Sequence, residues 1–432
     1  MSDSGSQAAS KRNFAWVEGI LFVAGFAVFL GTAIFADAHR HNNDFKHIYL
    51  GTEALVHGES PYSPEALFMQ AHEAGWGDEA INPFVYPPFT GLVMSFLAPF
   101  RFPAASQIWF FCSAICAVIA LFQIACHFWP NFRLGAFGVL LFSFGICHPW
   151  IRTLTAGQLN APLLLAYVIA FRMLEAGRER AAGSLLGIMA VYKITPAGHV
   201  LYFVLRRRWR GLVAMVVAAG GALLISGALF GWRPHLDYLP MMRQMSYGHS
   251  TWEQYGATFW KDPYNQSINS FLTHALVSSN RVTTPSFNFT QDAANLVTIL
   301  CSLALVAGYV YTFRQRRVAV SPLATKELYA NIDAAAYMGA LLLSLLIPSL
   351  MWDHYLLMTI LPVAWVVKRN LNERRRWVAV GAAMCFLLIC IPMRFDTGQF
   401  RHGAGIVMMS FKLFPTLAIL GLVGLSSRGK VV

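Results

Sequence analysis

The sequence predicts an all-α protein that crosses a membrane many times. Hydrophobic residues make up 56% of the 432-residue chain and charged residues only 12%, whereas soluble proteins carry about 25% charged residues. The apolar residues gather in long runs that short hydrophilic breaks separate. Because a backbone in lipid must satisfy its own hydrogen bonds, such runs fold as helices. We expect a bundle of about 11 to 13 transmembrane or half-length helices.

Basic residues indicate the topology. The net charge of +12 would suit a nucleic-acid partner, but the lysines and arginines cluster in the breaks between apolar runs, as they do in the cytoplasmic loops of membrane proteins. We therefore expect no nucleic-acid partner, and we place these clusters on the cytoplasmic side. They lie at Arg178 and Arg180, Arg206 to Arg210, Arg314 to Arg317, Lys368 to Arg376, and Arg428 and Lys430.

The first apolar run, Gly19 to Ala36, follows Lys11 and Arg12. It exceeds the roughly 7 to 15 apolar residues of a signal peptide, so we expect an uncleaved anchor with a cytoplasmic N-terminus. The expected organisation is a cytoplasmic tail over residues 1–14, a single transmembrane domain over residues 15–425, and a second cytoplasmic tail over residues 426–432.

The number of later runs between basic clusters raises two parity questions, because the number of membrane crossings decides on which side each cluster lies. Only one apolar run separates Arg178 from Arg206, and Lys193 and Pro196 interrupt it. Because both ends belong in the cytoplasm, this run should be a re-entrant hairpin or two half-length helices. Four runs lie between the first outside segment and Arg178 where an odd number is needed, so one of them does not cross. The apolar runs that follow the first one are 87–100, 104–126, 134–150, 159–174, 181–205, 211–230, 292–313, 334–350, 355–367, 377–393 and 404–425.

Two large outside loops, residues 37–86 and 231–291, then face each other across the bundle. Asp44 lies in the first of them, where it is a catalytic carboxylate, a solvated loop carboxylate or the N-cap of a helix that starts at Phe45. His41, Asp44 and His47 recur at three-residue spacing and could present one helical face to a metal. Since no cysteine or further carboxylate joins them, we predict no metal site.

Several polar side chains lie in or beside apolar runs. Lys193 costs roughly 2.5–3.5 kcal/mol to insert, so it should have a partner or ligand unless it reaches the interface. The amides of Gln158 and Asn160 either form interhelical hydrogen bonds or line a cavity. His354, Arg152 and Arg394 lie near outer or re-entrant edges. They are candidates to contact an anion such as a phosphate.

These residues belong to a succession of short motifs that resembles glycosyltransferase family 87 over about residues 44 to 367. The resemblance implies the GT-C membrane fold and a polyprenol-phosphate-mannose-dependent mannosyltransferase activity. The motifs are Asp44-Phe45, Pro61-Tyr62, Tyr86-Pro87-Pro88, Gly157-Gln158-Leu159-Asn160, Gly183 to Gly187, Lys193-Ile194-Thr195-Pro196, Arg206 to Trp209, Asn265-Gln266-Ser267 and Trp352-Asp353-His354-Tyr355.

The resemblance also implies roles for individual residues. Asp44 matches the catalytic base, and His354 is similar to a histidine near the donor phosphate. The sequence departs from the family pattern in the stretch Met69 to Asn82 and in the histidine-rich approach to Asp44, which leaves the acceptor open. With Lys193 and Arg152 we expect a phosphate site, and the expected substrate cavity contains Tyr62, Tyr86, Gln158, Asn160, Gln266 and Asp353.

The expected transfer reaction needs only one general base. Transfer from a polyprenyl-phosphate sugar releases a phosphate, which needs charge stabilisation more than a proton, so paired carboxylates are unnecessary. We expect an inverting transfer of mannose or another hexose to a glycolipid or polysaccharide hydroxyl. The expected place is the periplasmic face of a bacterial inner membrane, with the lipid-linked sugar as a substrate and no separate cofactor.

Two alternatives belong to other classes. A transporter or flippase of lipid-linked sugars would also have broken helices and an intramembrane lysine, but the sequence shows no internal repeat. A membrane haem protein would use histidines in or beside apolar runs, and His148, His199 and His354 are candidates.

Overall fold

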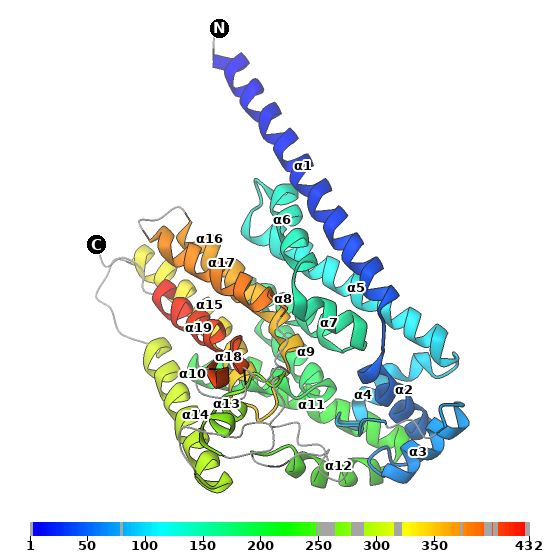
Figure 1. Cartoon of the computed structure of the whole chain (residues 1–432). Coiled ribbons are helices and arrows are strands. Elements are labelled where there is room, and N and C mark those ends of the chain that lie inside the picture. Colours follow the sequence, from blue (N-terminus) through cyan, green and yellow to red (C-terminus); the bar gives the residue numbers. More distant parts are fainter. Residues whose placement is uncertain are drawn as a thin grey trace.

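The computed structural model describes residues 3–77, 81–247, 249, 264–277, 289–314, 322–371, 375–392, 400 and 405–427. These residues form helices throughout, joined by short connections (Figure 1). Five described helices are long and apolar enough to cross a membrane, and a sixth span arises if a pair bent by 67° is counted as one. The predicted fold class, an all-α polytopic membrane protein, is confirmed.

The helices follow the predicted apolar runs closely. The spanning helices are α1 (Asp3–Ala38), α5 (Phe102–Phe128), α11 (Trp209–Phe230), α14 (Gln291–Phe313) and α15 (Pro322–Leu346), and the bent pair is α6 (Arg133–Gly145) with α7 (His148–Ala156). The other helices in or beside these runs are α4 (Pro88–Met94), η1 (Ser95–Leu97), α8 (Asn160–Glu175), α9 (Glu179–Tyr192), η2 (Thr195–Gly198), α10 (His199–Leu205), η5 (Asp353–Thr359), α16 (Ile360–Asn370), α17 (Arg376–Cys390), α18 (Gly405–Met409) and α19 (Leu413–Ser427).

The second parity question concerns the four runs before Arg178. The run 87–100 contains only α4 and η1, which together reach from Pro88 to Leu97. At 1.5 Å per residue this segment is about 15 Å long, half of the roughly 30 Å hydrocarbon core of a bilayer. It is the shortest of the four segments before Arg178, since α5, the α6–α7 pair and α8 are all longer.

The outside loops contain helices of their own. Residues 37–86 fold into α2 (Asn43–Val56) and α3 (Pro64–Glu73), and residues 231–291 include α12 (Arg233–Gln244) and α13 (Ile268–Leu276). Figure 1 shows α2, α3 and α12 together at the end of the bundle that lies away from both chain termini. The two segments that the sequence places outside thus share one end of the molecule.

The run between Arg178 and Arg206 forms two short helices, as predicted. α9 ends at Tyr192, Lys193 follows in extended conformation, and η2 with α10 leads back to Arg206. α9 also lies directly against α11, because a Cβ atom on Gly183 would come within 2.1 Å of the Gly211 carbonyl oxygen. Glycine therefore permits this helix contact, and the hairpin is held at a fixed position beside α11.

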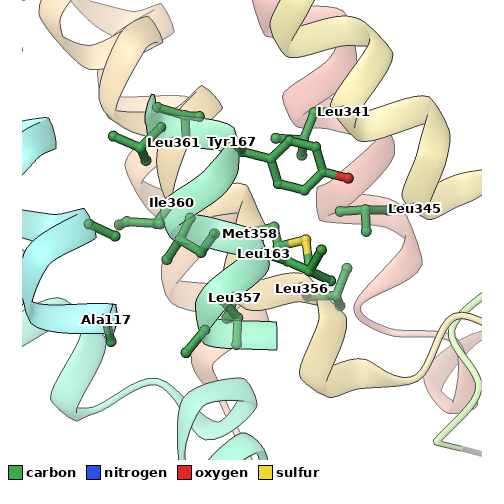
Figure 2. Packing of buried hydrophobic residues seen from close by; sticks show 14 of the residues in the cluster. Ala117, Leu163, Tyr167, Leu341, Leu345, Leu356, Leu357, Met358, Ile360 and Leu361 are labelled. Carbon is green, nitrogen blue, oxygen red and sulfur yellow. The ribbon is translucent and has the colours of Figure 1, made fainter. Parts of the chain in front are cut away.

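The buried core fixes the segment that carries the His354 motif. Figure 2 shows Leu163 and Tyr167 of α8, Leu341 and Leu345 of α15, and Leu356 of η5 packed together. Apolar packing between helices in lipid stabilises by close contact rather than by removal from water. The core therefore holds the start of η5 beside the start of α8, where Asn160 lies.

Candidate active site

The segment around Asp44 is tied to the end of α7. The backbone N–H groups of His41 and Asn42 both donate to the Thr155 carbonyl oxygen, at 3.1 and 2.9 Å. Asn42 adopts the left-handed conformation with φ 52°, and α2 begins at the next residue. Asp44 lies in the first turn of α2, where the helix dipole favours negative charge. It is therefore not the helix cap that the sequence allowed.

Gly157 lets α2 approach the turn after α7. Its φ of 71° is left-handed, and a Cβ atom there would lie 2.5 Å from the Cβ atom of Phe45. Any other residue would push α2 away. The side chain of the next residue, Gln158, lies close enough to the Asp44 carboxylate to lower its pKa. The glycine thus brings an amide from the α7–α8 turn against the carboxylate.

The Gln158 side chain joins Asp44 to Lys193. Its Oε1 atom accepts hydrogen bonds from the Tyr86 hydroxyl and from Lys193 Nζ, both at 3.3 Å. Because the carbonyl oxygen is occupied, the amide NH₂ group is the part that can donate to Asp44. One neutral amide therefore separates the carboxylate from the ammonium group.

Lys193 is 4% exposed and has neutral partners. Besides Gln158, its Nζ atom donates to Asn160 Oδ1 at 2.8 Å and lies 3.9 Å from the centroid of the Tyr355 ring. Asn160 in turn donates to the His354 carbonyl oxygen at 3.3 Å. The structure thus brings together the predicted residues Asp44, Lys193, Gln158, Asn160 and His354, which come from four distant parts of the chain.

The Asp44 carboxylate is ionised at neutral pH. Burial raises its pKa, but the electrostatic influence of the neighbouring His354 and His47, the Gln158 side chain and the charge of Arg152 hold the pKa below its usual value. Burial lowers the pKa of His354 to about 3, so this imidazole is neutral at pH 7. Of these neighbours, Arg152 is the one whose side chain stays positively charged at neutral pH. A neutral imidazole offers hydrogen bonds rather than positive charge to a phosphate.

Two imidazoles beside Asp44 have unused nitrogens. Neither ring nitrogen of His354, nor Nε2 of His47, has a hydrogen-bond partner within the described residues, although all three atoms are buried. The His47 ring stacks on Tyr86 with ring centroids 5.8 Å apart. Leaving a buried donor or acceptor unpaired costs about 1–3 kcal/mol. Such atoms are therefore positioned for a ligand or an ordered water.

A largely apolar cavity of about 440 Å³ opens beside Lys193. It lies between the hairpin, α12 and α15, and the rings of Tyr86 and Tyr355 form part of its wall at the Asp44 end. Its apolar lining includes Leu201, Met242, Met245, Leu343, Ile347 and Leu350.

Asp353 lies elsewhere than expected. Its side chain is 1% exposed and accepts a hydrogen bond from Arg152, and it pairs with Lys412 Nζ at 3.2 Å and with His148 Nδ1 at 3.4 Å. Burial raises the pKa of Asp353, but Arg152 and Lys412 together hold it well below the usual range. Rather than lining a substrate cavity, Asp353 joins α7 to the residues that precede α19.

Lys412 is the residue that sequence reasoning missed. It is buried and lies in the run 404–425, which was read as simply apolar. The signal that singled out Lys193, a lone lysine in an apolar run, applied to Lys412 equally.

Two other residues that were predicted to line the cavity, Tyr62 and Gln266, form hydrogen bonds with the backbone of residues around the site. The Tyr62 hydroxyl donates to the Tyr86 carbonyl oxygen at 2.5 Å, and Gln266 accepts from the Lys412 backbone N–H at 3.0 Å. Arg394 lies outside the described residues. Among the residues that are described, no group of three or more His, Cys, Asp or Glu side chains is arranged to hold a metal ion.

Similarity to known proteins identifies the family of this chain. The family model described as glycosyltransferase family 87 matches residues 84–325, more than half of the chain. The chain belongs to glycosyltransferase family 87. No solved structure matches it.

Two relatives are similar to part of this family 87 chain. A Mycolicibacterium smegmatis protein named polyprenol-phosphate-mannose-dependent alpha-(1-2)-phosphatidylinositol pentamannoside mannosyltransferase is 28% identical over 187 residues, which cover 43% of this chain and 42% of the relative. A Mycobacterium tuberculosis protein named polyprenol-phosphate-mannose-dependent alpha-(1-2)-phosphatidylinositol mannoside mannosyltransferase is 27% identical over 169 residues, 36% of this chain and 39% of the relative. The chain therefore spans about two fifths of the length of these relatives.

The family match confirms the resemblance for the middle of the chain. Gln158, Asn160 and Lys193 lie inside the matched residues, whereas Asp44 and His354 lie outside them. The case for Asp44 and His354 therefore rests on their position around Gln158 and Asn160.

Proposed function

We propose that this family 87 protein transfers a hexose from a polyprenyl-phosphate donor to an acceptor hydroxyl. The names of the two relatives favour mannose as the sugar and a glycolipid as the acceptor. The single observation that carries the proposal is the Gln158 side chain, which bonds the buried Lys193 and lowers the pKa of the Asp44 carboxylate beside an apolar cavity.

In this proposal Asp44 is the general base. The carboxylate is partly buried, so one edge remains open to an alcohol. It takes the proton of the acceptor O–H group while the acceptor oxygen forms a bond to the anomeric carbon. The bond from that carbon to the phosphate oxygen breaks on the opposite face, which inverts the configuration. The phosphate leaves with the electron pair as polyprenyl phosphate.

Lys193 would stabilise the charge that develops on the departing phosphate. A cation that is already in place, in a site that excludes water, stabilises such charge more strongly than it would in solution. His354 has two unbonded ring nitrogens and would add a neutral hydrogen bond. Arg152 is held by Asp353 and would act on the phosphate through its positive charge.

The apolar cavity beside Lys193 would take the beginning of the isoprenoid tail. Its 440 Å³ lies in the range of about 300–1,000 Å³ that is common for small-molecule sites. A cavity of this size holds only the isoprene units nearest the phosphate, so the rest of the tail would extend into the bilayer between α12 and α15.

We further propose that the site faces the periplasm of a bacterial inner membrane. Asp44 lies at the end of the bundle that carries α2, α3 and α12, away from both termini (Figure 1). The basic clusters at Arg178 and Arg206 belong to the other end, which the positive-inside rule places in the cytoplasm.

The test replaces Asp44 by asparagine, which keeps the shape of the side chain and removes the base. Membranes that contain Asp44→Asn, supplied with a radiolabelled polyprenyl-phosphate sugar, should lose about 10²- to 10⁴-fold in transfer rate and still bind the donor. The control is Asp37→Asn, which removes an exposed carboxylate that pairs with Arg40 at the end of α1. Transfer at the wild-type rate in Asp44→Asn would refute the role of Asp44. If the wild type moved donor across vesicles without any transfer, the protein would be a flippase instead.

A further inference from the structure

The start of α12 lies level with the last turn of the spanning helix α11. α11 has 22 residues and ends one residue before Gly231, whose φ of 78° turns the chain directly into α12. His235 Nε2 hydrogen-bonds the Ser226 hydroxyl at 2.7 Å. A Cβ atom on Gly227 would come within 2.8 Å of the Trp232 ring. Because both contacts are made one turn inside the end of α11, α12 begins at the boundary of the hydrocarbon region and not in the water beyond it.

The other end of α12 is tied to the end of a second spanning helix, α15. The Met245 carbonyl oxygen, just after α12, accepts a hydrogen bond from the Ser349 hydroxyl. The Tyr247 hydroxyl donates to the Ile347 carbonyl oxygen at 2.6 Å, and α15 ends at Leu346. A helix that joins the ends of two spanning helices runs along the membrane surface. Figure 1 accordingly shows α12 at the end of the bundle that lies away from both termini.

The surface of α12 divides into three sectors when its residues are placed at 3.6 per turn. The first sector is buried against the bundle and consists of Pro234, Tyr238 and Met241. The second is exposed and apolar, and we call it the apolar sector of α12; it consists of Trp232, Leu236 and Leu239. The third is polar and reaches the surface, and it consists of Arg233, Asp237 and Gln244. The exposed half of the helix thus has one apolar side and one polar side.

The apolar sector of α12 fits the acyl chains of a membrane surface. Trp232, Leu236 and Leu239 are each more than half exposed, and a helix with such a stripe beside a polar stripe lies in the plane of the interface. Trp232 is of a residue type that is enriched at this depth. Arg243 lies at the edge of the apolar sector in the last turn, where a long side chain can reach the water with its charged end.

We propose that α12 is an interfacial helix whose apolar sector inserts into the acyl chains of the leaflet at this end of the bundle, while its polar sector lies among the headgroups. The same helix forms part of the wall of the 440 Å³ cavity through Tyr238 and Met242. Met242 is also exposed, so it lies where the cavity meets the surface. α12 is therefore a partition between cavity and bilayer, and the partner of its apolar sector is the lipid itself. This inference is independent of the sugar and of the reaction.

The test measures the surroundings of single positions on α12 in the full-length protein, reconstituted in phosphatidylcholine nanodiscs. Leu236→Cys and Leu239→Cys place a thiol-reactive fluorophore in the apolar sector, and Arg233→Cys and Gln244→Cys place it in the polar sector as matched controls. The wild type, treated with the same dye, gives the background from its seven native cysteines. Phosphatidylcholine with a nitroxide near the top of its acyl chain should quench the first pair about threefold or more above the second, because the apolar face of an interfacial helix reaches the acyl boundary. Iodide in the water should show the reverse order.

Each other outcome contradicts the proposal in a recognisable way. If iodide quenched all four positions equally and the nitroxide lipid quenched none, α12 would lie in water above the membrane. If neither quencher reached the dye at Leu236→Cys and Leu239→Cys, another part of the chain or a second protein would cover the apolar sector. If the nitroxide lipid quenched all four positions alike, the helix would be immersed in the bilayer with no polar side. All four substitutions are at side chains that reach the surface, so the variants should fold like the wild type.

Discussion

Two buried lysines near the candidate active site should respond to the same substitution in opposite ways. Lys193 contacts neutral groups, namely two amide oxygens and the Tyr355 ring. Lys412 contacts the Asp353 carboxylate. Methionine has a similar length and carries no charge, so Lys193→Met and Lys412→Met form a matched pair that separates a role in the reaction from a role in folding.

The expected magnitudes follow from these partners. At 3.2 Å and an effective dielectric constant of about 20, the attraction between Lys412 and Asp353 is about 5 kcal/mol. Removing one partner of a buried pair costs about 3–5 kcal/mol, and we expect the lower end because Arg152 and His148 remain on Asp353. Lys193→Met loses hydrogen bonds to amides but also removes a buried charge, so its free energy of unfolding should change by only about 1 kcal/mol.

The rates should show the reverse order. Loss of a positioned charge beside a departing phosphate lowers turnover by about 10²- to 10³-fold, so Lys193→Met should be folded and nearly inactive. Lys412→Met should be unstable, and its folded fraction should retain most of the wild-type rate. Both quantities can be measured on purified protein, by thermal unfolding in detergent and by transfer of a labelled sugar. Equal losses of stability in the two variants, or transfer by Lys193→Met within about threefold of the wild type, would refute this reasoning.

Three further predictions concern the surroundings of these residues. Because the pKa of Asp44 lies below its usual value of about 3.9, kcat/KM should show no acidic limb above about pH 5 and should fall only at lower pH, where the carboxylate gains a proton; an acidic limb near pH 6.5 would indicate a histidine base instead. Gly157→Ala, which puts a methyl group against Phe45 at a left-handed φ, should cost about 1–2 kcal/mol or more and slow transfer; wild-type values in a melting and rate assay would argue against a fixed α2. Met242→Trp narrows the apolar cavity from α12 and should raise KM for a long-chain donor several-fold with little change in kcat, and a lower kcat at unchanged KM would contradict that use of the cavity.

The apolar runs of the sequence were sufficient to predict the fold class. The break in the run around Lys193 also became two short helices, because a lysine followed by a proline three positions later interrupts a membrane helix for clear physical reasons. The helices of the outside segments, such as α2 and α12, were not predicted. Their polar and apolar residues alternate over short stretches, and they fold against the bundle rather than through it.

The sequence was sufficient to predict several residues of the candidate site, but not the contacts that join them. Unusual residues in unusual places, such as Lys193 and the amides of Gln158 and Asn160, could be recognised one by one. Asp353 could not be assigned correctly, because the charges that surround it come from Arg152, 201 positions earlier, and from Lys412, 59 positions later. Ion pairs between distant segments leave no local mark in a sequence.

The position of Gln158 has a consequence for how long the two reactive charges stay available. If Asp44 and Lys193 touched, they could exchange a proton and become two neutral groups, or lock together and ignore the substrate. A carboxamide neither gains nor gives up protons at ordinary pH, so it insulates one charge from the other while fixing the distance between them. The protein can thereby keep the basic Asp44 carboxylate and the acidic Lys193 ammonium group near each other, without proton transfer between them, until a substrate binds.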